Sequence, residues 1–184
     1  DQPLAAAAPP VPRPTVAERV IAPLDDRDQL APGDQAILLI DDDLAFGDAL
    51  RQINRQLGYK TLLAGSGADG LELARRYRPA GILLDLGLPD MDGSEVLHAI
   101  KSSDLAPIPI YVVSARDRDA ALLRQGIVGY LQKPVNADQI ARVESEVMAA
   151  RAAVLVVGSG GIDAVEVLRI VGPRFGQVRQ CAAG

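Results

Sequence analysis

The sequence predicts an α/β fold in which helices flank a doubly wound sheet of five parallel strands. Two observations carry this prediction. Five short runs, each largely apolar, recur between residues 36 and 132, and amphipathic stretches of helical length separate them. Runs of this composition are typical of parallel strands that are covered on both faces. Right-handed crossovers then favour a single sheet, for which 2-1-3-4-5 is a common strand order.

The expected strands and helices alternate along the chain. The strands are expected at residues 36–41, 59–64, 81–86, 108–114 and 127–132. The helices are expected at residues 44–57, 68–77, 94–102, 117–125 and 137–152. Gly58 is placed to end the first helix, Pro79 follows the second, and Asn136 is a suitable N-cap for the last.

Charged residues stand where three of the apolar runs end. Asp41, Asp42 and Asp43 close the first run, Asp85 closes the third, and Lys133 closes the fifth. The carboxyl ends of parallel strands share one edge of the sheet, where ligands bind in open α/β folds, so these side chains are expected to meet. Crowded carboxylates require a divalent cation or a raised pKa. The sequence therefore predicts an acidic, cation-binding pocket at this edge.

Composition narrows the class of protein. The chain has 184 residues, of which 48% are hydrophobic and only 3% aromatic, so a globular fold with an aliphatic core is expected. The net charge of −5 argues against nucleic acid as a direct partner. A single cysteine cannot form an intrachain disulfide, and one cysteine with one histidine cannot form a Cys/His zinc site. No run of apolar residues is long enough for a membrane-spanning helix. We expect a cytoplasmic segment of a longer polypeptide.

Residues 1–33 are expected to be an interdomain linker that is rich in proline and alanine. Seven of the 13 prolines lie in this segment, which disfavours a long helix or a central strand. Within it, Asp25, Asp26 and Arg27 form a compact cluster of mixed charge. Two interpretations of the cluster stay open, namely solvated linker charges and a docking element that contacts a neighbouring domain.

Four motifs carry a resemblance to a known family. They lie at residues 39–43, 84–93, 113–115 and 130–134. In order and spacing they resemble the receiver domain of two-component signalling, which is the phosphoacceptor module of response regulators and hybrid sensor histidine kinases. The resemblance covers residues 34–150 and implies a flavodoxin-like receiver fold.

The resemblance implies a role for each residue of the acidic pocket. Asp85 would be the phosphoacceptor, whose carboxylate attacks a phosphohistidine and forms an aspartyl phosphate. Asp42, Asp85 and the backbone carbonyl of Gly87 would bind Mg²⁺ directly, and Asp41 would act largely through bound water. Lys133 would pair with Asp85 before the reaction and with the phosphoryl group afterwards.

The resemblance also implies a conformational switch. Ser114 would bond a phosphoryl oxygen through its hydroxyl, and Tyr130 would report that movement by its rotamer, although an ordinary half-buried strand tyrosine remains an alternative. The Lys133–Pro134 peptide bond is expected to be cis. The switch is expected on the face formed by the fourth helix, the fifth strand and the fifth helix, and a homodimer through this face is possible.

Further residues are interpreted in the same way. Gly87 and Arg116 would flank the water that hydrolyses the acyl phosphate; because Gly87 cannot orient it and Arg116 can shield the phosphoryl group, we expect slow autodephosphorylation. Asp43 is expected to face solvent. His98 is expected to be a partly exposed helix residue, so the phosphoryl donor must be another protein or domain.

Residues 151–184 are expected to begin a second, degenerate receiver-like domain that is truncated. A strand at 154–157, a helix at 162–171 and a strand at 176–182 would repeat the plan of residues 37–67. Gly158, Ser159 and Gly160 stand where the acidic cluster would be. A dinucleotide-binding turn is the alternative, although its third glycine is missing. This tail is a second possible contact for a homodimer.

Three classes of function stay open. The favoured one is a phosphorelay receiver from a hybrid histidine kinase, an acceptor rather than a turnover enzyme. Its partners would be a histidine kinase's phosphohistidine domain or a histidine phosphotransfer protein, together with neighbouring domains of the same chain. The second is a receiver-shaped interaction module that is never phosphorylated. The third is a phosphohydrolase of the haloacid-dehalogenase type, which the spacing of Asp41 and Asp43 resembles.

Overall fold

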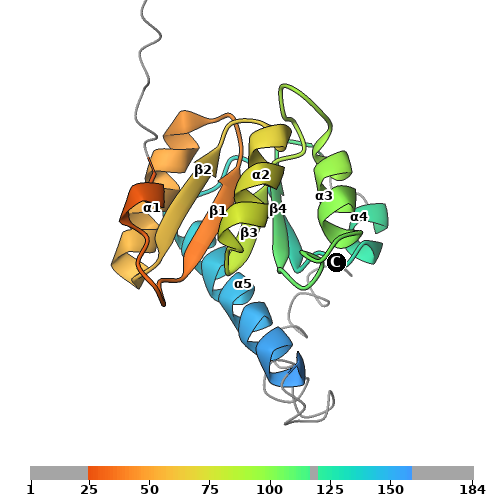
Figure 1. The fold of residues 1–184 in the computed structure, drawn as a ribbon. Helices are drawn as coiled ribbons and strands as arrows, with labels where there is room; N and C mark the ends of the chain where they lie inside the picture. Colours follow the sequence, from red (N-terminus) through yellow and green to blue (C-terminus); the bar gives the residue numbers. More distant parts are fainter. Residues whose placement is uncertain (1–24, 117–119, 159–184) are drawn as a thin grey trace, which may run out of the picture.

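The computed structural model describes residues 25–116 and 120–158. Its centre is a parallel five-stranded sheet with the order β2-β1-β3-β4-β5, so the predicted fold class and strand order are confirmed (Figure 1). The strands are β1 (Ala36–Ile40), β2 (Lys60–Ala64), β3 (Gly81–Leu84), β4 (Ile110–Ser114) and β5 (Gly129–Gln132). The helices are η1 (Arg27–Gln29), α1 (Leu44–Leu57), α2 (Gly67–Tyr77), α3 (Gly93–Lys101), α4 (Ala120–Arg124) and α5 (Ala137–Gly158).

Helices cover both faces of the sheet, which explains why β1 is apolar at every position. Ile37 and Leu39 pack in the cluster that includes α1 and α5, whereas Leu38 and Ile40 pack in the cluster that includes α2 and α3. All four side chains are at most 1% exposed. Burying one such side chain contributes about 2 kcal/mol, so β1 anchors the centre of the fold and places the residues that follow it.

Local capping determines where the helices next to the sheet edge begin. Asp43 is exposed, as expected, and its carboxylate accepts hydrogen bonds from the backbone N–H groups of Ala45 and Phe46 at the start of α1. Asn136 and Gln139 form a reciprocal capping box at α5, with both N–H to side-chain oxygen distances at 2.9 Å. The predicted N-cap at Asn136 is therefore confirmed.

Helix α5 corrects one prediction. The helix continues to Gly158, so the strand expected at residues 154–157 is wrong. No glycine or proline interrupts the chain between Ala137 and Val157, and the alanine-rich stretch before residue 154 favours helix. The helix expected at 162–171, the strand expected at 176–182 and most of the predicted second domain lie outside the described residues. The described part of α4 begins at Ala120, because residues 117–119 also lie outside them.

The N-terminal boundary differs from the expected one. Asp25 and Asp26 are buried against β2, with 5% and 1% exposure, although residues 1–33 were expected to be linker. The interpretation as solvated linker charges is wrong for Asp25 and Asp26, whereas the cluster does dock, on the sheet of the receiver that follows it. Residues 1–24 of the expected linker lie outside the described part. Among the described helices, none is both long and apolar enough to cross a lipid bilayer.

Candidate functional site

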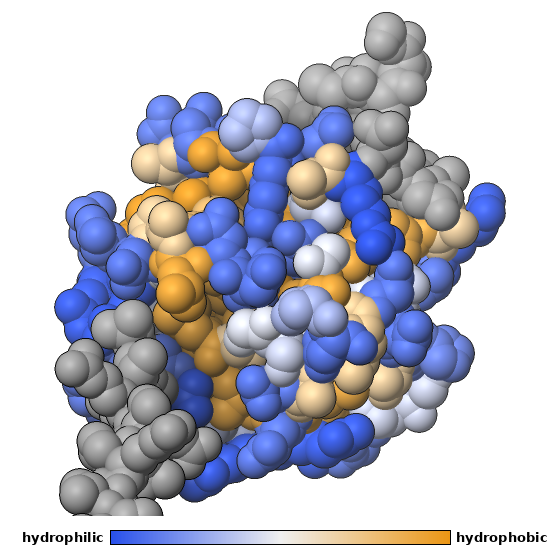
Figure 2. All heavy atoms as spheres, turned by 90° about the horizontal axis from the view of Figure 1, so that it is seen from above, coloured by the Kyte–Doolittle hydropathy of each residue, from blue (hydrophilic) through white to orange (hydrophobic). Residues whose placement is uncertain are grey.

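The predicted site residues meet at the carboxyl edge of the sheet. Asp41 and Asp42 follow β1, Asp85 follows β3, Ser114 ends β4, and Lys133 follows β5. Backbone hydrogen bonds continue the sheet beyond the strands, because Asp85 N donates to Ile40 O at 2.9 Å and Lys133 N donates to Ser114 O at 2.9 Å. The view from above in Figure 2 shows polar and apolar side chains interleaved over this part of the surface.

Three hydrogen-bond donors converge on the carboxylate of Asp85. Its Oδ1 accepts from the Ser114 hydroxyl at 2.6 Å and from Gly87 N at 3.0 Å, and its Oδ2 accepts from Lys133 Nζ at 3.0 Å. Burial alone would raise the pKa of Asp85, but these donors outweigh it and hold the pKa below its usual value. Asp85 is therefore an ionised carboxylate at neutral pH.

Asp41 shares the ammonium group of Lys133 with Asp85. Asp41 Oδ2 lies 2.6 Å from Lys133 Nζ, and Asp41 Oδ1 accepts from Asp43 N at 3.0 Å. Burial nevertheless raises the pKa of Asp41, whereas the pKa of Lys133 is raised because its two carboxylate partners outweigh its own burial. Sequence reasoning paired Lys133 with Asp85 alone and missed Asp41, although both acids were placed in one pocket.

The pocket has the composition of a magnesium site. Asp41, Asp42 and Asp85 each offer a carboxylate oxygen, and these oxygens all lie within 4.8 Å of one another. Two unit charges about 4 Å apart at an effective dielectric constant of about 20 repel by about 4 kcal/mol, and the single positive charge of Lys133 cannot balance three carboxylates. An all-oxygen donor set of this kind fits Mg²⁺. Asp42 is exposed and therefore accessible to an ion from solvent.

An ion pair spans two loops beside the pocket. Arg116, in the loop after β4, lies 2.6 Å from the carboxylate of Asp92, which caps α3. The Arg116 guanidinium and the N–H of Ser94 lower the pKa of Asp92 to about 2. Sequence reasoning selected Arg116 but missed Asp92, for which the only sequence signal was its N-cap position. The backbone of Arg116 also contacts both proposed switch residues, since its N–H lies 3.4 Å from Ser114 Oγ and its carbonyl accepts from the Tyr130 hydroxyl.

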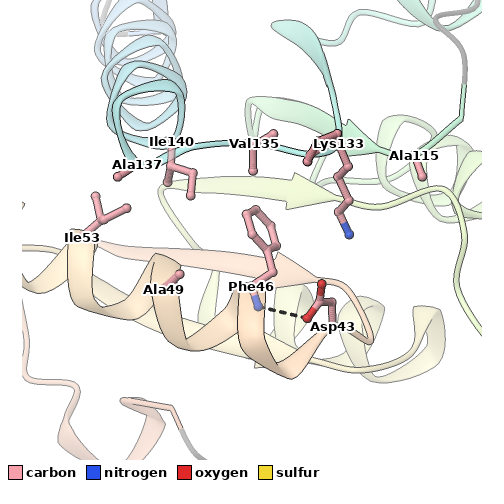
Figure 3. A pocket seen from close by; sticks show the side chains of 10 residues that line it. Asp43, Phe46, Ala49, Ile53, Ala115, Lys133, Val135, Ala137 and Ile140 are labelled. Atoms are coloured by element: carbon pink, nitrogen blue, oxygen red, sulfur yellow. Dashed lines mark hydrogen bonds between the residues drawn. The ribbon is translucent and has the colours of Figure 1, made fainter.

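A groove adjoins the pocket on the side of α1 (Figure 3). Apolar side chains from both sides line most of it: Phe46, Ala49 and Ile53 from α1, Val135 from the segment before α5, and Ala137 and Ile140 from the start of α5. Lys133 reaches into its charged end, where Asp43 also lies, and its ammonium is 5.2 Å from the centre of the Phe46 ring. The Lys133–Pro134 peptide bond at this end is cis. The groove thus connects an apolar surface directly to the acidic pocket.

The remaining candidates lie away from the acidic cluster. His98 is exposed on α3, four residues before Ser102, whose hydroxyl is 3.5 Å from its ring nitrogen. Asp90, which belongs to the motif at residues 84–93 but was given no role of its own, accepts from the N–H groups of Gly67 and Ala68 at 2.8 and 2.9 Å. Asp90 therefore caps α2 from the loop after β3 and ties that loop to the neighbouring helix.

The model of the response regulator receiver domain matches residues 37–143. This chain belongs to that family. The receiver is 40% identical over 101 residues to the transcriptional regulatory protein AfsQ1 of Streptomyces coelicolor, which covers 54% of this chain and 45% of AfsQ1. It is 36% identical over 107 residues to the response regulator MprA of Mycobacterium leprae, which covers 56% of this chain and 46% of MprA. The receiver thus spans about half the length of these curated relatives.

Solved structures show the same fold. The signal receiver domain of a LuxO repressor protein from Vibrio parahaemolyticus superposes with a TM-score of 0.62 at 28% identity, covering 67% of this chain and 97% of that one. The receiver domain of sensor histidine kinase PA1611 from Pseudomonas aeruginosa has a TM-score of 0.56 at 27% identity, covering 62% and 98%. That neighbour carries a magnesium ion coordinated in its active-site cleft.

Proposed function

We propose that this receiver accepts a phosphoryl group from a phosphohistidine onto Asp85 with Mg²⁺ as cofactor. The observation that carries the proposal is the convergence of Ser114, Gly87 and Lys133 on a single ionised carboxylate. A carboxylate that only terminates a strand needs no such set of donors. Membership of the receiver family supports the same role in a phosphorelay.

The reaction is a transfer between two nucleophiles. An oxygen of Asp85 attacks the phosphorus atom, the P–N bond of the donor breaks, and the electron pair stays on the departing histidine nitrogen. Lys133 and the Ser114 hydroxyl offset the negative charge on the transferred group, because both already lie within 3.0 Å of the attacking carboxylate.

The acidic cluster supplies the cofactor site. Asp42 and Asp85 would hold Mg²⁺ directly, the carbonyl of Gly87 would add a third oxygen, and Asp41 would act through water. The bound ion would neutralise part of the charge on the equatorial phosphoryl oxygens. Asp41 also keeps Lys133 in place through its 2.6 Å ion pair, so the ammonium stays between the two strand ends.

The output is a conformational switch at the face of α4, β5 and α5. Ser114 and Tyr130 both contact the backbone of Arg116, which links the hydroxyl beside Asp85 to the strand at this face. When Ser114 turns toward the phosphoryl group, it must leave Asp85 Oδ1 and alter this loop. We infer that the loop shift changes the population of conformers at that face, where a homodimer could form.

Two other functions remain as alternatives. A phosphohydrolase of the haloacid-dehalogenase type would use Asp41 as nucleophile and Asp43 as acid, but the Asp43 carboxylate caps α1 and Asp41 is held by Lys133. An inert interaction module would keep the fold without accepting phosphate. Turnover of small phosphate esters tests the first alternative, and absence of labelling tests the second.

Labelling with acetyl phosphate and Mg²⁺, read by intact mass, tests the proposed function. We expect a single phosphoryl adduct that Asp85→Asn abolishes. Asp43→Asn is the matched control, because it makes the same charge change at an exposed residue of the same pocket edge. A fully labelled Asp85→Asn variant would overturn the assignment of the nucleophile.

A second part of the proposal concerns the longer protein that contains this receiver and the donor of its phosphoryl group. We infer a cytoplasmic hybrid sensor kinase, with a phosphohistidine domain or a histidine phosphotransfer protein as donor. The proline-rich segment before the receiver and the apolar stretch after residue 158 support neighbouring domains on both sides. Phosphotransfer profiling against candidate kinases would identify the donor, and transfer only from a domain of an unrelated chain would exclude the hybrid arrangement.

A further inference from the structure

The open edge of the sheet at β2 carries four backbone groups that need partners. β2 pairs with β1 on one side only, and the N–H of Lys60 and the carbonyl of Ala64 bond to the chain on that side. The alternating residues Thr61 and Leu63 direct their N–H and C=O groups to the outer edge. An edge with such groups unpaired is a template for pairing with another chain.

Residues 25–27 satisfy all four groups. Thr61 N donates to Asp26 Oδ2 at 3.0 Å, and Asp26 N donates to Thr61 O at 2.9 Å. Leu63 N donates to Asp25 Oδ2 at 2.9 Å, and Arg27 Nη2 donates to Leu63 O at 3.1 Å. Two carboxylates, one guanidinium and one backbone N–H thus occupy the place of a further strand.

Strong interactions hold this segment in place. Asp25 and Asp26 are 5% and 1% exposed, and the Asp26 carboxylate is paired with Arg51 and Arg55 of α1 at 3.1 and 3.3 Å. Burial opposes ionisation of Asp26, but the N–H of Thr61 and these arginines lower its pKa below the usual value. The segment therefore contacts both β2 and α1 as an ionised anchor.

We propose that residues 25–27 are a clip that seals the β2 edge against a second copy of this chain. An identical edge is complementary to itself, because two β2 strands in antiparallel order would each offer the N–H and C=O groups of Thr61 and Leu63 to the other. The clip removes this possibility and is itself held on α1 by the ion pairs of Asp26 with Arg51 and Arg55. The receiver unit accordingly includes residues 25–27, and its β2 edge is a latent self-association surface.

The test compares the full chain with the double variant Asp25→Ala/Asp26→Ala. We expect the amides of Thr61 and Leu63 to exchange about tenfold faster or more in dilute solution, because each loses its buried acceptor. With increasing concentration we expect the measured mass to double and the protection of these two amides to return. Light scattering after size-exclusion chromatography and hydrogen exchange read by mass spectrometry measure the two effects.

The matched control is Asp28→Ala/Asp48→Ala, which makes the same charge change at two exposed residues. It is expected to stay monomeric with Thr61 and Leu63 protected. Three results would each overturn the proposal: unchanged protection at Thr61 and Leu63 in the test variant, a test variant that stays monomeric at all concentrations, or protection lost equally at Leu38 and Leu83 in the sheet centre. The last result would show that the clip residues hold the whole fold and do not specifically seal its edge.

Discussion

Lys133 lies closer to Asp41 than to Asp85. Its Nζ is 2.6 Å from Asp41 Oδ2 and 3.0 Å from Asp85 Oδ2, so one ammonium bridges the ends of β1 and β3 from the end of β5. Asp41 is nearly fully buried, and its carboxylate depends on this contact to offset the cost of burial. The bridge therefore has two tasks: it keeps the pocket assembled, and it places a positive charge beside the proposed nucleophile.

Replacing the ammonium by an apolar group is expected to impair phosphorylation. In Lys133→Met, Asp41 and Asp85 lose their shared cation, and the developing phosphoryl charge loses one of its stabilising groups. We expect the labelling rate with acetyl phosphate to fall by about tenfold or more, which corresponds to about 1.4 kcal/mol in the barrier. Lys60→Met in β2 is the control, and equal rates in the two variants would contradict the role of Lys133.

Magnesium is expected to stabilise the receiver through Asp42. A ligand that binds only the folded state at about 100 times its dissociation constant adds about 2.7 kcal/mol to the free energy of unfolding. Thermal unfolding should therefore shift upward with Mg²⁺, and EDTA should reverse the shift. Asp42→Asn should lose most of this response, whereas Asp43→Asn should retain it. An unchanged response in Asp42→Asn would exclude this residue as a ligand.

The ion pair between Arg116 and Asp92 gives a prediction for the lifetime of the phosphorylated state. Gly87 offers no side chain to orient a water, and Arg116 is held beside the pocket, so we expect autodephosphorylation over minutes or longer. Arg116→Ala should shorten the lifetime. Asp92→Asn keeps an N-cap on α3 and removes the charge partner of Arg116, but it leaves the guanidinium that shields the phosphoryl group. This variant should therefore not shorten the lifetime. A lifetime of seconds for the unmodified receiver would contradict the prediction.

Gly93 is required by its contact with the backbone that carries Asp85. A Cβ atom at residue 93 would lie 2.3 Å from Asp85 O and 2.6 Å from Leu86 Cα, and neither backbone atom can move without displacing the loop. Gly93→Ala is expected to destabilise the fold by about 1–3 kcal/mol and to slow labelling of Asp85. Gly65→Ala, where a Cβ would meet nothing within 4 Å, is the control. Denaturant unfolding and labelling rates measure both effects.

Glu144 gives the receiver a pH-dependent stability. It is fully buried on α5, and burial raises its pKa to about 8 from 4.5, although the amide of Asn54 opposes the shift. Between these pH values the unfolded chain releases a proton that the folded chain retains. The free energy of unfolding should therefore fall as pH rises from about 4.5 to about 8, by a total on the order of 5 kcal/mol from this group.

The comparison with Glu144→Gln isolates this effect. The variant is neutral at every pH, so it should be more stable than the unmodified receiver at pH 8 and should lack this part of the pH dependence. Either state of Glu144 can be satisfied, because a protonated carboxyl can donate to the Asn54 oxygen and a carboxylate can accept from the amide after it turns. Identical pH profiles of denaturant unfolding in the two proteins would contradict the prediction.

Much of the fold could be predicted from the chain because its signals are local. Runs such as Ile37 to Ile40 are buried on both faces, and this alone predicts a central parallel strand. Local signals also have limits. The apolar run at residues 154–157 is compatible with strand or helix, and in the structure it continues α5. The run carries no local mark that would distinguish the two.

The residues of the candidate site could be selected from sequence, but their pairing could not. Strand ends placed Asp41, Asp85 and Lys133 at one edge, since topology brings the carboxyl ends of parallel strands together. The Lys133 ammonium lies closer to Asp41 than to Asp85, although Asp41 is 92 positions away in the sequence and Asp85 only 48. No local pattern indicates this preference. Arg116 was likewise chosen for its position, while its partner Asp92, 24 positions away, emerged only from the packed loops.

The amino-acid order alone was enough for the parallel sheet and its acidic edge, because these follow from hydrophobic periodicity and chain connectivity. The strand order was predicted as a common one for such sheets and from the resemblance to receiver domains. Three-dimensional packing was needed for the partners of individual charges. From the sequence, Asp25 and Asp26 are indistinguishable from linker residues. In the structure they accept hydrogen bonds from N–H groups of β2, more than 30 positions later, that do not pair with β1. A charged side chain acquires its role from the donors and acceptors that folding brings within about 3 Å, and no local pattern records them.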